Sequence, residues 1–450
     1  MAVLLLTVCS PPADNSKNIA DSKDSLRTSI ANEMEVVFKN KMLDVWYPAF
    51  IDTTFGGYLS NFDKTWKADL VQNKFIVTQA RHIWAISSIY EKYPELEDYP
   101  DFAKQGFQFL KSHMWDTTFG GFVQMVTREG DSNVKTFGKE KRAYGNAFAI
   151  YGLAALYRIT GDPEVLSLAQ ESFYWLDSVA RDKTHGGYFE HLNEDGSPIM
   201  QFNPTAGDAF TIGYKDYNSS IHILEAFAEL YRVWPDQLLR SRLMEMFTLI
   251  KDTFMGEKAY LTLYFHPDWQ PVSDTELLER TGGVHLHGNH ITFGHDIETA
   301  FLLIEAAEVL QLPIDDFLLR EIKAIVDRVL NYAWDHANGG IYERGKLIND
   351  QVVITDSSKV WWSQAEAMNS LLMLSELIPE KKEHYFDYFI QSWRFNHDNL
   401  IDQTNGGWYE WSIDTYPSDK QIKKAHSWKG TYHDGRSMLR CIHTLRTTHQ

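Results

Sequence analysis

An internal repeat constrains the fold of this chain more than any other feature of its sequence, because repeats of this length mark folds built from stacked or ringed units. The repeated pattern is an aspartate, three variable residues, two glycines and an aromatic or apolar residue. Copies begin at Asp52, Asp116, Asp182, Asp335 and Asp402. Their starts are 64, 66, 153 and 67 residues apart, so one copy is missing from the long interval. A degenerate copy beginning at Asp252 lies in that interval and makes six units.

Each unit also carries two runs of helical periodicity. Apolar residues recur three and four apart over Phe148–Tyr157 and Val165–Val179, and again over Ile221–Trp234 and Leu238–Phe254. The two glycines allow a tight turn, and strand periodicity is otherwise scarce. Six helical hairpins can close into an (α/α)6 barrel or stack as an open solenoid. We expect an all-α (α/α)6 barrel with short loop strands, because six units use nearly the whole chain.

The repeats indicate one domain with a short extension. Residues 30–450 form the predicted barrel without a linker, and residues 1–29 are predicted to be a disordered tail. The apolar segment Met1–Cys9 is too short to span a membrane and lacks a basic region. It could be the end of a lipoprotein signal, in which case Cys9 would carry a lipid anchor in the periplasm. We favour a cytoplasmic protein with a frayed N-terminus.

The composition argues against several classes of function. The chain has 43 basic and 61 acidic residues, and the resulting net charge of −18 disfavours nucleic acid and anionic membranes as partners. Two cysteines are too few for a disulfide framework or a cysteine-rich zinc site. The 14 Trp and 22 Tyr offer flat faces suited to stacking on sugar rings. We expect a small neutral molecule such as a sugar as the partner, and a monomer or weak dimer.

Polar residues interrupt the apolar face of the first helix of each unit, at the same phase of all six repeats. A closed barrel would bring them together at one rim. A buried polar residue often only satisfies a helix end or an ion pair, so each alone is weak support for a site. As a set they predict one. The set comprises Arg81, Tyr144, His222, His295, Glu298, Trp362, Glu366, Trp428 and His433.

The histidines of this set predict acid–base chemistry. His295 and Glu298 lie three residues apart, so they share a helical face on which the carboxylate can orient and tune the imidazole. The sequence has no serine elbow or phosphate loop. One histidine can take the proton beside a sugar carbonyl while another, such as His433, returns a proton to the opposite face. Arg81 would stabilise the oxyanion that forms.

A histidine cluster raises a metal site as an alternative. His285, His287 and His290 end the region 268–290, which reads as a long irregular loop. Their His-x-His spacing is found in zinc and iron sites, although no carboxylate stands at helical spacing beside them. We expect a surface loop with solvated histidines, and neither a metal nor another cofactor.

Three motifs occur in order in the second half of the chain: Gly-His-Asp-Ile-Glu at 294–298, Trp-Trp-x-Gln-Ala-Glu at 361–366 and Lys-Gly-x-Tyr-His-x-Gly-Arg at 429–436. Together they resemble the N-acylglucosamine 2-epimerase superfamily, and most closely its cellobiose 2-epimerase branch, over roughly residues 30–446. The resemblance implies an (α/α)6 barrel that inverts C2 of the reducing-end glucose of cellobiose and related β-1,4-linked disaccharides without metal or nucleotide.

The resemblance also implies roles for the residues named above. It makes His295 and His433 the acid–base pair, with the other positions binding the sugar ring or stabilising charge: Arg81, Tyr144, His222, Glu298, Trp362, Glu366 and Trp428. The chain departs from the branch at Phe301, where tryptophan is frequent, and at Thr431, where proline is usual. These changes bear on which sugar is preferred.

Three other functions stay open from the sequence. A mannose isomerase or an N-acetylglucosamine 2-epimerase would use the same chemistry. A glycoside hydrolase on the same barrel would use Glu298 and Glu366, with carboxylates about 6.5–9.5 Å apart for an inverting enzyme. A sugar-binding barrel without catalysis would leave the histidine pair unexplained.

Overall fold

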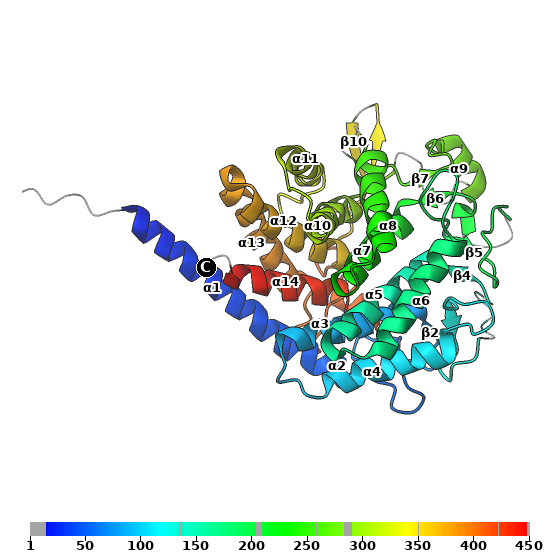
Figure 1. Ribbon diagram of the computed structural model, residues 1–450. Coiled ribbons are helices and arrows are strands. Elements are labelled where there is room, and N and C mark those ends of the chain that lie inside the picture. The colour runs from blue at the N-terminus through cyan, green and yellow to red at the C-terminus, as the bar shows by residue number, and fades with distance from the viewer. Residues whose placement is uncertain are drawn as a thin grey trace, which may run out of the picture.

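Two concentric rings of helices build the protein (Figure 1). This computed structural model describes residues 15–447 except 133, 135–136, 138, 204–208, 257–259, 283–289, 350 and 422. Each inner helix contacts the next, and the last contacts the first, so the ring is closed. The inner helices are α3 (Ile76–Lys92), α5 (Ala143–Thr160), α7 (Tyr217–Val233), α10 (Phe293–Leu310), α12 (Trp361–Leu377) and α14 (His433–Thr447).

The outer helices pack against the inner ring and are apolar on one side only. In α11, buried residues recur three and four apart, as at Leu318, Ile322 and Ile325, whereas α5 is buried on all sides over most of its length. The closed all-α (α/α)6 barrel is therefore as predicted. The outer helices are α1 (Asn15–Val37), α4 (Tyr99–Phe109), α6 (Pro163–Val179), α8 (Gln237–Thr248), α11 (Asp316–Tyr332) and α13 (Lys382–Asn399), with α2 (Asp44–Ala49) following α1.

Short antiparallel strands link neighbouring units at the rim from which the inner helices start. Most form pairs: β2 (Lys74–Phe75) with β3 (Met125–Val126), β4 (Lys141–Arg142) with β5 (His191–Leu192), and β6 (Lys215–Asp216) with β7 (Tyr264–Phe265). A fourth pair, β1 (Phe62–Asp63) with β11 (Lys423–Ala425), joins the first unit to the last.

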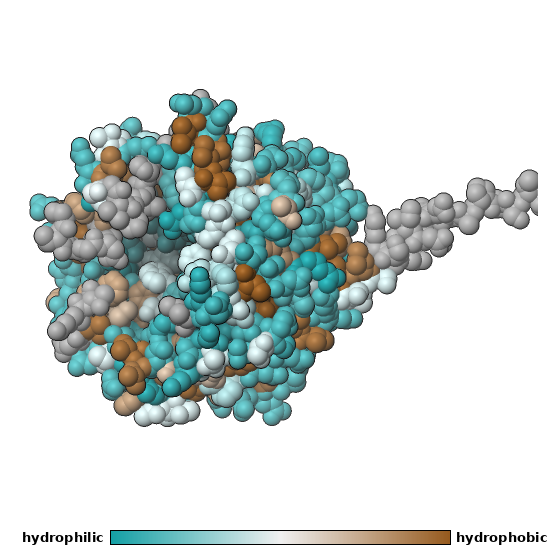
Figure 2. Space-filling model, turned by 180° about the vertical axis from the view of Figure 1, so that it is seen from behind, coloured by the Kyte–Doolittle hydropathy of each residue, from teal (hydrophilic) through white to brown (hydrophobic). Residues whose placement is uncertain are grey.

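One unit departs from the short strands that were predicted. There β8 (His290–Thr292), β9 (Arg344–Ile348) and β10 (Gln351–Asp356) form a three-stranded sheet. The β9–β10 hairpin projects from the rim of the barrel (Figure 1). Its side chains Ile348 and Val353 are exposed, and apolar atoms are visible on the projecting part of the surface (Figure 2).

The repeated aspartate closes the turn that leads to each inner helix. Asp335 accepts hydrogen bonds from the backbone N–H groups of Ala337 and Asn338, and both following glycines, Gly339 and Gly340, have positive φ. A buried lysine, Lys359, lies 2.9 Å from the Asp335 carboxylate. The same ion pair recurs as Asp52–Lys74, Asp116–Lys141, Asp182–Lys215 and Asp402–Lys424. Where the motif is degenerate at Asp252, the corresponding lysine is replaced by the buried Ile291.

Several expectations need correction. The helix α1 begins at Asn15, so residues 15–29 are helical rather than a disordered tail. The region 268–290 contains α9 (Asp274–Thr281), and His290 is buried in β8 rather than solvated. Cys9, His285 and His287 lie outside the described residues, so the lipid anchor and the histidine cluster stay predictions. Within the described ranges, no helix has the length and apolarity needed to cross a membrane.

Candidate active site

The predicted site residues meet at the rim where the inner helices begin. Eight of the nine line one chamber of about 190 Å³: Arg81, Tyr144, His222, His295, Glu298, Trp362, Trp428 and His433. The ninth, Glu366, lies beneath this inner chamber and contacts His433. The residues come from the first two turns of all six inner helices, apart from Trp428, which precedes α14. The common phase predicted from the repeats is therefore confirmed.

A second, larger chamber of about 440 Å³ opens beside the inner chamber. The two share five lining residues, namely Tyr144, Asn218, His295, Trp362 and Trp428. The remainder of the outer chamber comes mainly from strands β4, β6, β7, β8 and β9 and the residues around them. A hollow on the face seen in Figure 2 shows that the molecule is open to small ligands. Together the chambers have room for more than one sugar ring.

His295 lies between aromatic rings, without a carboxylate partner. Its ring centroid is 5.3 Å from that of Tyr217 and 5.0 Å from that of Trp362, and its buried Nδ1 has no hydrogen-bond partner among the described residues. Burial in this surrounding, with the nearby charges of His222, His290 and Arg344, lowers the pKa of His295 to about 3. His295 is therefore neutral at neutral pH, the form that accepts a proton.

His433 has the carboxylate partner that His295 lacks. Its Nδ1 lies 2.7 Å from Oε1 of Glu366, whereas Glu298 is 3.9 Å away. Burial and the guanidinium groups of Arg81 and Arg436 hold the pKa of His433 well below its ordinary value. Because Nδ1 is engaged with Glu366, Nε2 is the ring nitrogen that remains to face a ligand.

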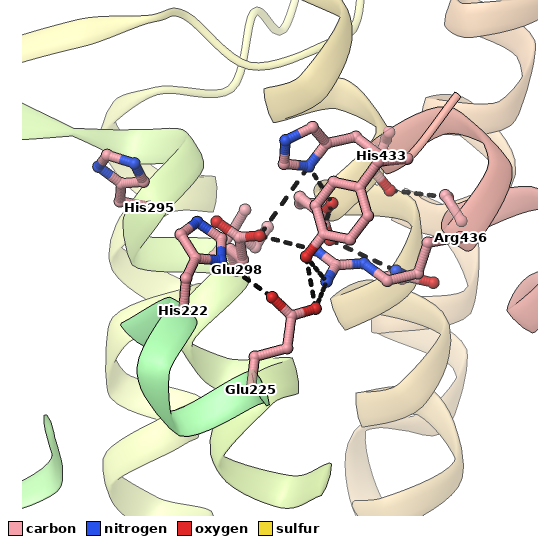
Figure 3. A network of polar contacts seen from close by, with 12 residues as sticks. His222, Glu225, His295, Glu298, His433 and Arg436 are labelled. Atoms are coloured by element: carbon pink, nitrogen blue, oxygen red, sulfur yellow. Dashed lines mark hydrogen bonds and ion pairs between the residues drawn. The ribbon is translucent and has the colours of Figure 1, made fainter. Parts of the chain in front are cut away.

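The expectation that Glu298 orients His295 is wrong, because Glu298 contacts Arg436 of α14 instead. Nη2 of Arg436 donates to Glu298 and to Glu366, at 2.7 Å each, while Nη1 contacts Glu225 (Figure 3). No interaction connects His295 to this network in Figure 3. The buried guanidinium is a stronger partner for a carboxylate than a neutral imidazole that has stacked against aromatic rings.

One guanidinium among three carboxylates cannot balance their charge if all are ionised. Although burial opposes its ionisation, Arg436 lowers the pKa of Glu225 to about 2. Burial and the neighbouring Glu366 raise the pKa of Glu298 to about 8, and burial raises that of Glu366 as well. Glu298 therefore holds a proton at neutral pH, and no residue in the described part of the chain forms a hydrogen bond with its buried Oε2.

Arg81 and His222 form the remaining polar wall of the inner chamber. Nη2 of Arg81 donates to the Tyr144 hydroxyl at 2.9 Å, and its guanidinium lies over the Phe148 ring. Nδ1 of His222 lies 2.9 Å from Glu225. Arg81 can donate to sugar oxygens. Because Nδ1 of the neutral His222 donates to the ionised Glu225, its Nε2 can accept a hydrogen bond from a sugar hydroxyl.

Two tryptophans supply apolar faces around the polar groups. Trp362 contacts the rings of both His295 and His433, with centroid distances of 5.0 and 5.7 Å. Gly294 is required beside it, because a Cβ on Gly294 would lie 2.5 Å from the Trp362 ring. Trp428 is 49% exposed at the mouth and packs on Phe75, so its free face can stack on a sugar.

Sequence reasoning did not include Glu225, Tyr432 or Arg436 among the site residues. Glu225 follows His222 at the same spacing by which Glu298 follows His295, so a His-x-x-Glu pattern repeated in two units was a usable signal. No comparable spacing indicated Arg436, because the carboxylates that it contacts are distant in sequence. Phe301 lies outside both chambers, where its ring stacks under the guanidinium groups of Arg436 and Arg440.

The residues Glu298, Glu366 and His433 are also spaced as metal ligands can be, with ligand atoms within 4.8 Å of one another. The guanidinium of Arg436 contacts both carboxylates, so a positive charge already occupies the position that a metal ion would take. That the chemistry proceeds without a metal stays a prediction.

Comparison with known proteins defines the class to which this barrel and site belong. The family of N-acylglucosamine 2-epimerases matches residues 57–434, and the chain belongs to this family. It is thus an enzyme of the carbohydrate epimerases, which are isomerases.

The chain is also similar to individual proteins over most of its length. A cellobiose 2-epimerase from Bacteroides fragilis is 29% identical, with 92% of this chain and 98% of the relative covered. The solved structure of a cellobiose 2-epimerase from Spirochaeta thermophila superposes with a TM-score of 0.80 at 28% identity, covering 95% and 99% of the two chains. A D-mannose isomerase from Marinomonas mediterranea is 22% identical, with coverage of 90% and 95%.

Proposed function

We propose that this protein inverts C2 of the reducing-end sugar of a β-1,4-linked disaccharide such as cellobiose, interconverting its glucose and mannose forms. The observation that carries the proposal is the placement of two neutral histidines, His295 and His433, from separate helices at one chamber. Glucose and mannose differ only at C2, so the reaction requires removal of one proton and its return to the other face. The similarity to cellobiose 2-epimerases supports this choice of substrate.

The reaction begins with opening of the sugar ring, because C2–H becomes acidic only beside a carbonyl. In our proposal Nε2 of His433 takes the proton from O1, and the C1–O5 bond breaks as O1 becomes the carbonyl oxygen. Glu298 supplies a proton to O5, since it is protonated at neutral pH. Arg81 and Tyr144 donate to O1 and hold the open chain.

Epimerisation then transfers protons at C2. His295 takes the C2 proton, and the electron pair forms the C1–C2 double bond while negative charge moves to O1, beside Arg81. His433 returns the proton that it took from O1 to the opposite face of C2, and O1 becomes a carbonyl again. When the ring closes, the proton on O5 returns to Glu298. The proton on His295 passes through water to O1 and replaces the proton that O1 lost in the first step. Acid–base groups in such positions contribute about 10²–10⁴-fold each.

Two alternatives differ in their products. An isomerase would move the proton from C2 to C1 and yield a ketose, and the similarity to a D-mannose isomerase keeps this candidate. An inverting hydrolase is disfavoured, because the carboxylate oxygens of Glu298 and Glu366 lie within 4.8 Å, whereas the water between its two carboxylates requires about 6.5–9.5 Å.

An NMR time course with cellobiose in D₂O tests the proposal. We expect deuterium at C2 and accumulation of glucosyl-mannose, with His295→Asn and His433→Asn each slowing both at least about 100-fold. His397→Asn, at a histidine on the outer helix α13, is the matched control and should leave the rate unchanged. A ketose product would identify an isomerase and free glucose a hydrolase. Absence of C2 exchange with every aldose tested would refute the proposal.

A further inference from the structure

The outer chamber contains a guanidinium that the proposed chemistry does not use. Arg344 lines this chamber, and its buried Nε has no hydrogen-bond partner. Neither a hydrogen bond nor an ion pair engages its guanidinium within the part of the chain that the structure describes. A buried donor without a partner costs about 1–3 kcal/mol, so its presence beside a chamber calls for an explanation, and a bound ligand is one.

The other charged side chains of the outer chamber are already engaged. Arg142 pairs with Glu140 at 2.8 Å. Three carboxylates accept hydrogen bonds from residues at the starts of inner helices. Glu190 accepts from the Tyr144 N–H, and Asp216 accepts from the Ser219 N–H. Glu343 accepts from the Ser363 hydroxyl. Among the charged side chains that line this chamber, Arg344 is thus the one without a hydrogen bond or ion pair to any residue that the structure describes.

The fold fixes the position of Arg344 relative to His295. It is the first residue of β9, and its register partner in β8 is Thr292, which immediately precedes α10 and therefore His295. The N–H of Phe293 also donates to the carbonyl of Glu343, which fixes the start of α10 against β9. The sheet that carries Arg344 is the one with the long β9–β10 hairpin, the feature that distinguishes this unit from the others.

We propose that Arg344 determines the preference for a disaccharide by binding the sugar unit beyond the one that reacts. The inference rests on the proposed function, because it requires the reducing-end sugar to occupy the inner chamber. With that ring between His295 and His433, the second ring extends into the outer chamber. A guanidinium has five donors and no acceptor, which matches the hydroxyl and ring oxygens of a sugar.

The variant Arg344→Met tests this role, since methionine keeps an unbranched apolar side chain but removes every donor. We expect the KM for cellobiose to rise about 10- to 100-fold, the usual effect of losing a hydrogen bond to a charged group. The value of kcat should change less than about threefold, because a contact made equally in ground and transition states affects KM alone. The inhibition constant of mannose as a competitor should not change, since a single ring fills the inner chamber only.

Controls separate this inference from a structural effect and from the proposed function. Arg320→Met removes an arginine of the outer helix α11 and should alter neither constant. Arg344→Lys should recover part of the lost affinity. An unchanged KM for cellobiose, or an equal weakening of cellobiose and mannose, would overturn the role of Arg344 while leaving the epimerase intact. Failure of the wild-type protein to exchange C2 of cellobiose would instead refute the proposed function.

Discussion

At the scale of single residues, the site treats its two central histidines differently. His295 is surrounded by Tyr217 and Trp362, so its neutral form is favoured by poor solvation of the charged form. His433 is held by Glu366, which fixes the tautomer and the direction of its free nitrogen. In the proposed mechanism, this difference suits His295 to accepting the C2 proton and His433 to exchanging a proton with the sugar oxygen.

The protonated Glu298 leads to a prediction about pH. If it supplies the proton for ring opening, kcat/KM for cellobiose should be constant between about pH 5 and 7 and fall tenfold per unit above its pKa of about 8. Protonation of His295 should reduce the rate only at far lower pH, because its pKa is about 3. A pH–rate profile measured at low substrate concentration checks this. Activity that stays flat to pH 10 would exclude Glu298 as the donor.

At the scale of elements, a buried ion pair attaches each inner helix except α10 to the preceding turn. Lys359 is fully buried in the segment that immediately precedes α12, and it contacts both Asp335 and Asp414. The bond from Lys359 holds the pKa of Asp335 well below its usual range, although burial opposes this. The ion pair therefore ties the start of the helix that carries Trp362 and Glu366 to the turn that precedes it.

Replacing Lys359 by methionine should lower the free energy of unfolding by about 3 kcal/mol, because the Asp335 carboxylate is left without its cation. Chemical denaturation followed by circular dichroism measures the loss. In the matched double variant Asp335→Asn, Lys359→Met, the Asp335 charge is removed and only the Asp414 carboxylate loses its cation, so this variant should be more stable than the single variant. Equal stability of the two would show that charge pairing is not what the lysine provides.

The repeat sufficed to predict the barrel, but it did not predict which residue pairs with the aspartate of each repeat. Asp335 and Lys359 are 24 residues apart, whereas Asp182 and Lys215 are 33 apart, so no fixed spacing marks the lysine. The long β9–β10 hairpin and α9 are insertions in single units, which periodicity cannot reveal. The choice of Arg436 over His295 as the partner of Glu298 depends on α14, 138 residues away. Residue types of the site were therefore predictable, and their pairing was not.

At the scale of the whole molecule, the barrel is closed by contacts between its two ends. The helix α1 packs against α14, as the blue and red helices of Figure 1 show, and β1 pairs with β11. Three residues of α1, Ile30, Ala31 and Met34, are at most 1% exposed. Closure thus rests on apolar burial as well as on strand pairing.

Truncating Met34 to alanine should destabilise the protein by about 2–5 kcal/mol, the range for deleting a large buried side chain. The control is Val36→Ala on the same helix, where the side chain is 58% exposed and the change should stay within about 0.5 kcal/mol. Denaturation followed by both fluorescence and activity provides the measurement. An effect of Met34→Ala no larger than that of the control would mean that the contact between α1 and α14 contributes little to stability.

The pairing of the first outer helix with the last inner helix also has a consequence for synthesis. A growing chain emerges from the ribosome N-terminus first, so α1 is made long before α14 exists to cover Ile30 and Met34. Until α14 is released, the apolar side chains of this segment are exposed to water or shielded by a chaperone. The ring can therefore close only after α14 has been made, and a chain stopped short of α14 would be a substrate for quality control rather than a smaller barrel.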